Sequence, residues 1–176
     1  KPVLRKSQFL FSQFPFSAVL LRLVNQLLDF QKLDAGRQAL HLRSLNLTQF
    51  LYICGDYFKS ACSTKGISFQ LNLDDRPRIV KADPDALEKI VFNYLSNALK
   101  YTPPGGKIIL GIQSLPNAKD VRVDVTDSGQ GIREEDQAKL FQVFGQIEGS
   151  TTREYEGTGL GLALVKSLVE EMQGEV

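Results

Sequence analysis

Two amide side chains four residues apart stand out in the segment 83–102 (DPDALEKIVFNYLSNALKYT). At about 100° per residue, a helix there would place Asn93 and Asn97 on one face. Lys100 and Tyr101 would share that face, with the apolar residues on the opposite arc. A carboxamide oxygen is a hard, neutral ligand that suits Mg²⁺, and a lysine beside it could meet a phosphate charge. An ordinary solvated face is the alternative, although such faces are mostly Glu, Lys and Arg, and asparagine is only a middling helix former.

A second candidate segment, Asp127 to Ile132 (DSGQGI), follows residues 121–127, which alternate valine with polar residues as a strand does. Gly129 and Gly131 would let the backbone turn tightly and approach a ligand closely. Asp127, at the end of the strand, could accept a hydrogen bond from an exocyclic amine such as that of adenine. An ordinary Asp/Gly turn is the alternative explanation.

Glycines also open the last amphipathic segment, in residues 157–162 (GTGLGL). Gly157, Gly159 and Gly161 would expose backbone N–H groups at the start of a helix, whose partial positive charge attracts anions. The segment is not a Rossmann fingerprint, because no strand directly precedes it. It is not a Walker A loop either, because no Gly-Lys-Ser/Thr follows. Alone, it is a weak indication of a phosphate site.

The apolar periodicity predicts the elements that position these segments. Helices are expected over residues 19–33, 47–66, 84–98 or slightly beyond and 134–141, and residues 157–172 are expected to form a glycine-rich turn that leads into an amphipathic helix. Strands are expected over residues 41–47, 67–73, 107–115 and 121–127, with a further strand beginning at 174–176. The third and fourth strands would form a hairpin. The sum is an α+β fold, a two-layer α/β sandwich with a mixed, mostly antiparallel sheet, helices on one face and a helical segment before it.

The composition narrows the class of protein. The 176 residues include 21 basic and 20 acidic ones, a formal net charge of +1, which argues against a dedicated nucleic-acid binder. The length suits one full domain with an appendage. No apolar run approaches the roughly 18 residues that span a bilayer, and no secretory signal is recognisable. Cys54 and Cys62 lack metal-ligand spacing and are interpreted as core thiols of a soluble domain in a reducing compartment.

Four segments in this order resemble one known family. FNYLSNALKYTPPGG, DVTDSGQGI, LFQVFGQ and GTGLGLALVKSLV closely resemble the N, first glycine, F and second glycine boxes of the catalytic ATP-binding domain of sensor histidine kinases. That domain belongs to the superfamily shared with gyrase, heat-shock chaperone and mismatch-repair ATPases. VNQLLDFQKLDAGRQALHL resembles the second helix of the dimerisation and phosphotransfer region. The resemblance implies a partial dimerisation segment over residues 1–40 and a catalytic ATP-binding kinase domain over residues 41–176.

The resemblance also implies roles for individual residues. Asn97 would coordinate Mg²⁺, with Asn93 close to the metal or the phosphates, and Lys100 would contact phosphate; these three would be the catalytic residues. Tyr101 would line the nucleotide site, and Asp127 would accept a hydrogen bond from the adenine amino group. The other implied nucleotide-binding residues are Gly129, Gly131, Ile132, Phe144, Gly157, Thr158, Gly159, Leu160, Gly161 and Leu162.

The F box and the segment after it would form the mobile ATP lid. Phe141 and Phe144 would anchor a lid expected over residues 145–156. Many family members carry an arginine two positions after the second phenylalanine, where this chain has Gln146. Glutamine followed by STTRE resembles the hybrid kinases with fused receiver domains, and Arg153 is a candidate source of the missing positive charge.

The single histidine, His41, does not match the phosphoacceptor of the family. That acceptor lies in a motif like His-Glu/Asp-Leu-Arg-x-Pro, whereas His41 lies in ALHLRS with no acidic neighbour and no following proline. We therefore interpret the chain as a fragment that lacks the acceptor helix at one end and the last strand or strands at the other. Such a fragment would not autophosphorylate by itself.

The implied function is transfer of the ATP γ-phosphoryl group to a histidine in a two-component phosphorelay, with ATP and Mg²⁺ as cofactors. The implied partners are the protein's own dimerisation helix, a response regulator or receiver domain, and a second copy in a homodimer, with no nucleic acid. A cytoplasmic domain is expected, and the membrane attachment of the parent protein is left open. The alternatives are a serine-phosphorylating kinase of the same fold, and a nucleotide-sensing or scaffolding module without transferase activity.

Overall fold

The computed structural model describes residue 28 and residues 39–115, 120–145 and 159–176. The predicted helix over residues 19–33 therefore lies outside the described residues, apart from Leu28. The elements along the chain are β1 (Arg43–Asn46), α3 (Leu47–Thr64), β2 (Ser68–Asn72), β3 (Ile79–Ala82), α4 (Pro84–Tyr101), β4 (Lys107–Ser114), β5 (Val121–Asp127), α5 (Glu134–Gln137) and α6 (Gly161–Glu171).

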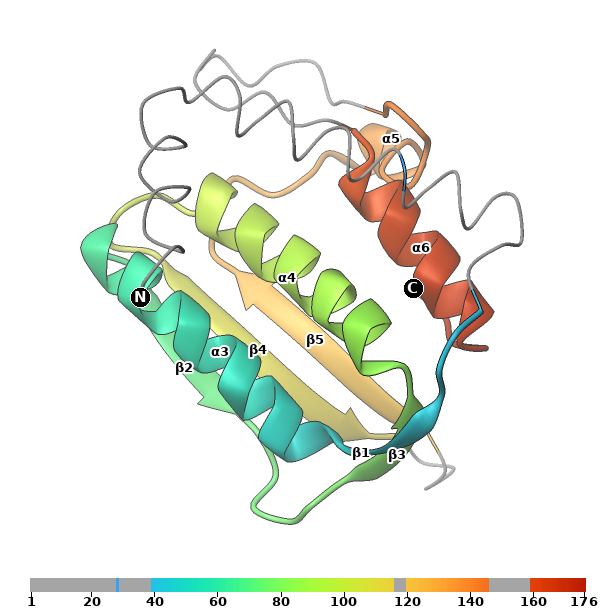
Figure 1. Ribbon diagram of the computed structural model, residues 1–176. Coiled ribbons are helices and arrows are strands. Elements are labelled where there is room, and N and C mark those ends of the chain that lie inside the picture. The colour runs from blue at the N-terminus through green and yellow to red at the C-terminus, as the bar shows by residue number, and fades with distance from the viewer. Residues whose placement is uncertain (1–27, 29–38, 116–119, 146–158) are drawn as a thin grey trace, which may run out of the picture.

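The sheet is mixed, as the sequence predicts. Three strands lie in the order β2-β4-β5, with β2 parallel and β5 antiparallel to the central β4. β1 and β3 form a separate antiparallel pair. Figure 1 shows α3 and α4 lying across one face of the three-stranded sheet, with α6 beside α4. The result is the predicted two-layer α/β arrangement with its helices on one face.

Local signals explain where α4 begins and ends. The Asp83 carboxylate caps the helix by accepting hydrogen bonds from the backbone N–H groups of Asp85 (2.9 Å) and Ala86 (3.1 Å). The same side chain accepts a third hydrogen bond from the His41 N–H at 2.7 Å, which ties the chain before β1 to α4. At the other end, Thr102 has an extended backbone and is followed by a proline. A residue before proline disfavours the helical conformation, so α4 ends at Tyr101.

Two apolar clusters hold the helices in place. The larger lies between the helices α3 and α4 and the sheet, with Leu51, Leu95 and Leu110 at its centre. The smaller lies between α4 and α6 and consists of Ala86, Ile90, Leu164, Val165 and Leu168. α4 contributes to both clusters, so its remaining face is the one left for polar side chains.

The structure differs from the sequence predictions in three elements. β3 was not predicted, because four residues are too few for a recognisable alternation and its partner β1 is distant in sequence. The helix expected over residues 134–141 is regular only over Glu134–Gln137 and continues as turns. Residues 174–176 do not form a strand: Gln173 has a left-handed backbone (φ 62°), and the Gly174 N–H donates to the Val169 carbonyl, which closes α6.

Both cysteines lie in the interior as free thiols, as predicted. Within the part of the chain that the structure describes, no helix combines the length and apolarity needed to cross a membrane.

Candidate active site

The polar face predicted on α4 exists, and its first amide lies against α6. Asn93 and Asn97 are half-buried, whereas Leu95 on the other side of the helix is 1% exposed. The Asn93 Nδ2 donates to the Lys89 carbonyl at 2.8 Å, so its Oδ1 is left for another partner. That oxygen faces the first residue of α6: a Cβ on Gly161 would lie 2.5 Å from it. Only glycine fits at that position without displacing the asparagine.

The two predicted site residues Lys100 and Tyr101 pair with each other at the C-terminal end of α4. The Lys100 Nζ donates to the Tyr101 hydroxyl at 2.9 Å and lies 4.6 Å from the centre of the tyrosine ring. Lys100 is half-buried, and Tyr101 is 44% exposed. The pair therefore places a positive charge and an aromatic face beside the end of the helix.

Lys65 fixes the last turn of α4, which sequence reasoning missed. Its ammonium group donates to the carbonyls of Leu99 (2.6 Å) and Lys100 (3.1 Å). Carbonyls at a helix C-terminus have no partner within the helix and favour a positive charge. No sequence pattern around Lys65 predicts this contact, because Lys65 belongs to the turn after α3 and its partners on α4 are distant in sequence.

The glycine loop after β5 passes directly under this end of α4. The Gly129 N–H donates to the Asp127 Oδ1 at 2.7 Å, and a Cβ on Gly129 would lie 2.9 Å from the Tyr101 carbonyl oxygen. Ser128 holds the loop to β4, because its Oγ accepts from the Lys107 N–H at 2.8 Å and its own N–H donates to the Lys107 carbonyl at 3.0 Å. Asp127 and the loop thus lie beside Tyr101.

The F box and the second glycine box also meet. The Phe144 N–H donates to the Gly159 carbonyl at 3.1 Å, and Gly159 has a left-handed backbone (φ 67°). A Cβ on Gly159 would lie 2.8 Å from the backbone of Phe144. Phe144 itself has φ 61° and is 64% exposed, and Phe141 is half-buried. This contact joins the segment after β5 to the start of α6.

The remaining predicted site residues divide into three groups. Gly131 and Ile132 form the end of the glycine loop, and both are exposed, Ile132 by 46%. Leu162 is half-buried, whereas Leu160 is 1% exposed, so the Leu160 side chain belongs to the interior. Gly157, Thr158, Gln146 and Arg153 lie outside the described residues, as do most of the expected lid and most of the segment 1–40.

The chemistry of the site is that of amides, a lysine and backbone N–H groups. The described residues contain no group of three or more His, Cys, Asp and Glu side chains that could hold a metal ion.

The two cysteines lie outside this chemistry. Burial and the nearby Glu88 raise the pKa of the Cys54 thiol to about 11, and burial raises the pKa of Cys62. A raised pKa favours the protonated thiol, which is the less reactive form.

The comparison with protein families identifies this arrangement. A family model described as "Histidine kinase-, DNA gyrase B-, and HSP90-like ATPase" matches residues 82–176. The chain belongs to this family. The match includes all four boxes and confirms the resemblance to the catalytic ATP-binding domain of sensor histidine kinases.

Individual relatives agree with this assignment. "Hybrid signal transduction histidine kinase D" of Dictyostelium discoideum is 34% identical over 160 residues, which are 89% of this chain and 10% of that protein. "Circadian input-output histidine kinase CikA" of Synechococcus elongatus is 39% identical over 161 residues, 89% of this chain and 21% of that protein. The crystal structure of full-length ShkA in complex with AMPPNP superposes with a TM-score of 0.76 at 29% identity, covering 88% of this chain and 31% of that one. The chain thus spans only a small part of the kinases that it matches.

Proposed function

We propose that this chain binds ATP with Mg²⁺ between the polar face of α4, the loop after β5 and the first turn of α6. We further propose that it transfers the γ-phosphoryl group to a histidine on a dimerisation helix. One observation carries the proposal: Gly129 lies against the Tyr101 carbonyl and Gly161 against the Asn93 amide. Three of the four boxes therefore meet along α4, although they are far apart in sequence.

The base would bind at the glycine-loop end of this space. The exposed Asp127 carboxylate accepts one hydrogen bond from the Gly129 N–H, and each carboxylate oxygen has capacity for more. It is therefore able to accept a second hydrogen bond from the exocyclic amine of adenine. The exposed ring of Tyr101 would form the adjoining wall.

The phosphates would bind at the other end, where α6 begins. Among the described residues, the N-cap of α6 makes no side-chain cap hydrogen bond, and the positive end of a helix attracts an anion. Lys100, which pairs with Tyr101 at the glycine-loop end of α4, would have to leave the Tyr101 hydroxyl to bring its positive charge to the phosphates. Both groups would attract the phosphates and hold them in position. Positioning and electrostatic stabilisation are the main contributions that a protein makes to phosphoryl transfer.

The amides of α4 fit a magnesium ion. Because the Asn93 Nδ2 is bonded to the Lys89 carbonyl, its Oδ1 is the atom directed at the start of α6. Asn97, one turn along, offers a second carboxamide oxygen on the same face. Mg²⁺ binds one or two such hard oxygens and keeps waters and phosphate oxygens as its other ligands. When bound, the ion would offset the negative charge of the phosphates.

The acceptor histidine and the partners belong to the same proposal. His41 is not the acceptor, since its N–H is held by Asp83 at the start of α4, whereas the proposed phosphate site lies beside the second half of that helix. The hybrid kinases among the relatives support a receiver domain or response regulator as the next phosphoryl acceptor. A homodimer through the segment 1–40 and a cytoplasmic location complete the proposal.

Titration with ATP and Mg²⁺ tests the binding site. We expect Asp127→Ala and Asn97→Asp each to weaken ATP binding by about tenfold or more, because one removes a base contact and the other adds a negative charge beside the phosphates. Asp56→Ala removes an exposed carboxylate on α3 and is the matched control. Equal affinity of the Asp127→Ala variant and the unaltered chain would contradict the assignment.

Transfer is tested separately, with labelled ATP and a peptide that contains a family-type acceptor helix. Formation of phosphohistidine supports the kinase. ATP binding without any phosphohistidine would favour the nucleotide-sensing alternative, and phosphoserine on a protein substrate would favour a serine kinase of the same fold.

A further inference from the structure

The segment that joins the glycine loop to Phe144 has no apolar core of its own. Among residues 131–145, all of them described, Asp136 alone is buried, with 4% of its surface exposed. Of the large apolar side chains, Ile132 (46%), Val143 (42%) and Phe144 (64%) are exposed, and Leu140 and Phe141 are half-buried. A charged residue therefore occupies the place that an apolar anchor normally takes.

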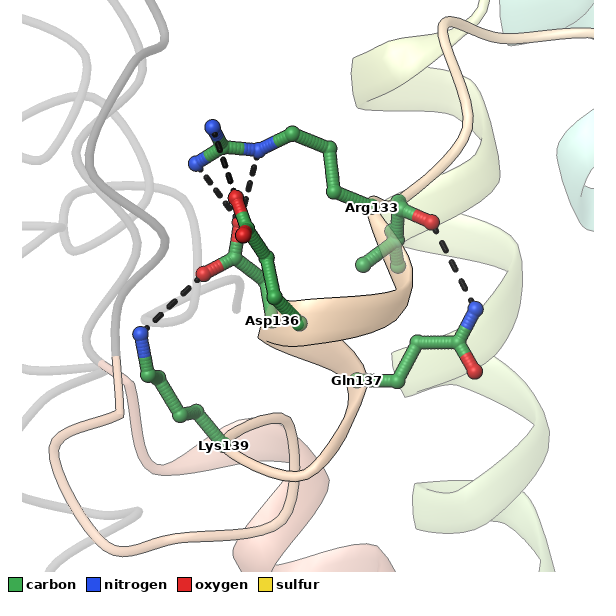
Figure 2. A network of polar contacts seen from close by, with 6 residues as sticks. Arg133, Asp136, Gln137 and Lys139 are labelled. Carbon is green, nitrogen blue, oxygen red and sulfur yellow. Dashed lines mark hydrogen bonds and ion pairs between the residues drawn. The ribbon is translucent and has the colours of Figure 1, made fainter.

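Figure 2 shows what surrounds the Asp136 carboxylate. The Arg133 Nε donates to Oδ2 at 2.9 Å, and the Arg133 Nη2 lies 2.8 Å from the same oxygen. The Lys139 Nζ donates to Oδ1 at 3.2 Å, so both carboxylate oxygens are engaged. The hydrogen bond from Lys139 outweighs burial and, with that from Arg133, lowers the pKa of Asp136. The carboxylate is ionised at neutral pH.

The backbone of the segment forms a series of turns that starts at this cluster. The N–H groups of Asp136, Lys139, Gln142 and Gly145 donate to the carbonyls three residues earlier, at 2.9, 3.0, 3.1 and 2.9 Å. The ion pair between Asp136 and Arg133 spans the first of these turns, and the ion pair between Asp136 and Lys139 spans the second. α5 has four residues and no side-chain N-cap, so it is too short to be stable by itself.

The last turn of the series leads to the contact with the second glycine box. Gly145 directly follows Phe144, whose N–H donates to the Gly159 carbonyl. Gly159 lies two residues before the first residue of α6. An unbroken series of turns therefore connects Asp136 to the contact with Gly159, next to the start of α6.

We propose that Asp136 is a positioning residue, whose carboxylate, held between Arg133 and Lys139, fixes the chain from Ile132 to Phe144 and thereby the placement of Gly159 and the start of α6. Its consequence for catalysis rests on the proposed function, in which the phosphates bind at that helix start. Loss of the carboxylate would then affect recognition of the γ-phosphate more than recognition of the base.

Amide hydrogen exchange in the full 176-residue chain tests the positioning role without any nucleotide. Asp136→Asn keeps the shape of the side chain and removes its charge. We expect the Phe144 amide to exchange about tenfold faster in this variant, because the contact with Gly159 opens more often, and the core amide of Leu110 to be unchanged. Equal exchange at Phe144 in both proteins would overturn the proposal, as would an unprotected Phe144 amide in the unaltered chain.

Glu135→Gln is the matched control. Glu135 also pairs with Arg133, at 3.0 Å, but its side chain is 68% exposed, whereas that of Asp136 is 6% exposed. The control removes one negative charge from the same short helix and is expected to leave exchange at Phe144 unchanged. An effect as large as that of Asp136→Asn would show that net charge matters rather than the buried carboxylate, and would overturn the proposal.

The two cations provide an independent check. Because both act through one carboxylate, Arg133→Gln combined with Lys139→Gln should reproduce the exchange of Asp136→Asn. Adding Asp136→Asn to that double variant should then change little, within about twofold. A full additional effect would contradict a shared role for the three residues.

Nucleotide binding tests the consequence for catalysis. We expect Asp136→Asn to weaken binding of a non-hydrolysable ATP analogue about fivefold and binding of ADP less than about twofold, because the two ligands differ at the γ-phosphate. Equal weakening of both ligands would overturn the γ-phosphate role. If the unaltered chain bound neither nucleotide, the proposed function would fail, while the exchange measurement would still decide whether Asp136 positions the segment.

Discussion

At the scale of single residues, close backbone approach is what defines the site. Gly129 and Gly161 each lie where a Cβ would collide with an atom of α4, the Tyr101 carbonyl in one case and the Asn93 Oδ1 in the other. These glycines therefore do more than permit a turn. They allow the loop after β5 and the start of α6 to lie against α4, as the proposed site requires.

Gly161→Ala separates the role of this glycine in the site from its role in the helix. Alanine is the better helix former, so the free energy of unfolding should change by less than about 1 kcal/mol. The added methyl group would displace Asn93, and we expect ATP binding about tenfold weaker, equivalent to about 1.4 kcal/mol. Nucleotide titration and thermal unfolding measure the two effects. Ser167→Ala, further along α6, is the control, and an unchanged affinity in Gly161→Ala would contradict the contact.

At the scale of elements, both ends of α4 are fixed by charged side chains from elsewhere in the chain. Asp83 binds the N–H groups at its start, and Lys65 binds the carbonyls at its end. Burial opposes ionisation of Asp83, but hydrogen bonds from three backbone N–H groups outweigh it and lower the pKa of the carboxyl. The helix that carries the amides is thus held in place along its axis.

Asp83→Asn tests the cap and its dependence on pH. A carboxyl whose pKa is lowered by folding stabilises the protein above its unfolded pKa of about 3.9 and loses that contribution as the pH falls through the folded pKa. Asparagine can keep the capping Oδ1 but replaces the Oδ2 that accepts from the His41 N–H. We expect the variant to lose about 1 kcal/mol at pH 7, and the difference from the unaltered chain to shrink below about pH 4. Urea unfolding at pH 7 and pH 3 measures this. Asp85→Asn, an exposed carboxylate in the same turn, should cost less.

Lys65→Met tests the other end of α4. Methionine keeps most of the side chain's length but leaves the carbonyls of Leu99 and Lys100 without their donor. We expect the free energy of unfolding to fall by about 1 kcal/mol and ATP binding to weaken, because Lys100 and Tyr101 lose their fixed position. Urea unfolding and nucleotide titration measure both effects. Lys59→Met removes an exposed lysine of α3 and should change neither.

The sequence predicted the elements whose signals are local. The cap at Asp83, the prolines after Thr102 and the alternation of residues 107–115 and 121–127 are all readable within a few residues. β3 could not be predicted, because four residues become a strand only by pairing with β1.

The same limit applies to the site. The boxes were recognisable, but Lys65 and Ser128 were missed because their partners lie elsewhere in the chain. Asp136 resembles an ordinary residue of a charged surface run, and its pairing with both Arg133 and Lys139 is seen only in the folded chain.

At the scale of the whole molecule, α3, α4 and the sheet share one core, so the parts of the site should unfold together. Cys54 and Cys62 report on this core, being 3% and 1% exposed. Burial keeps both thiols protonated and inaccessible. We expect a thiol reagent at pH 8 to label neither cysteine in the native chain, and to label both at the urea midpoint seen by circular dichroism. Labelling of Cys62 at lower urea would show that α3 opens separately.

One face of α4 belongs to the core and the other to the proposed site, and this limits which mutations the chain can tolerate. One side of the helix fills two apolar clusters, while the other presents Asn93, Asn97 and Lys100. A residue inserted near the middle of the helix would rotate everything beyond it by about 100°. The amides would then turn toward the core and leucines toward the ligand. Substitutions along α4 can be accommodated one at a time, but a change in its length cannot, so related chains should vary in the loops on either side and keep this helix free of insertions and deletions.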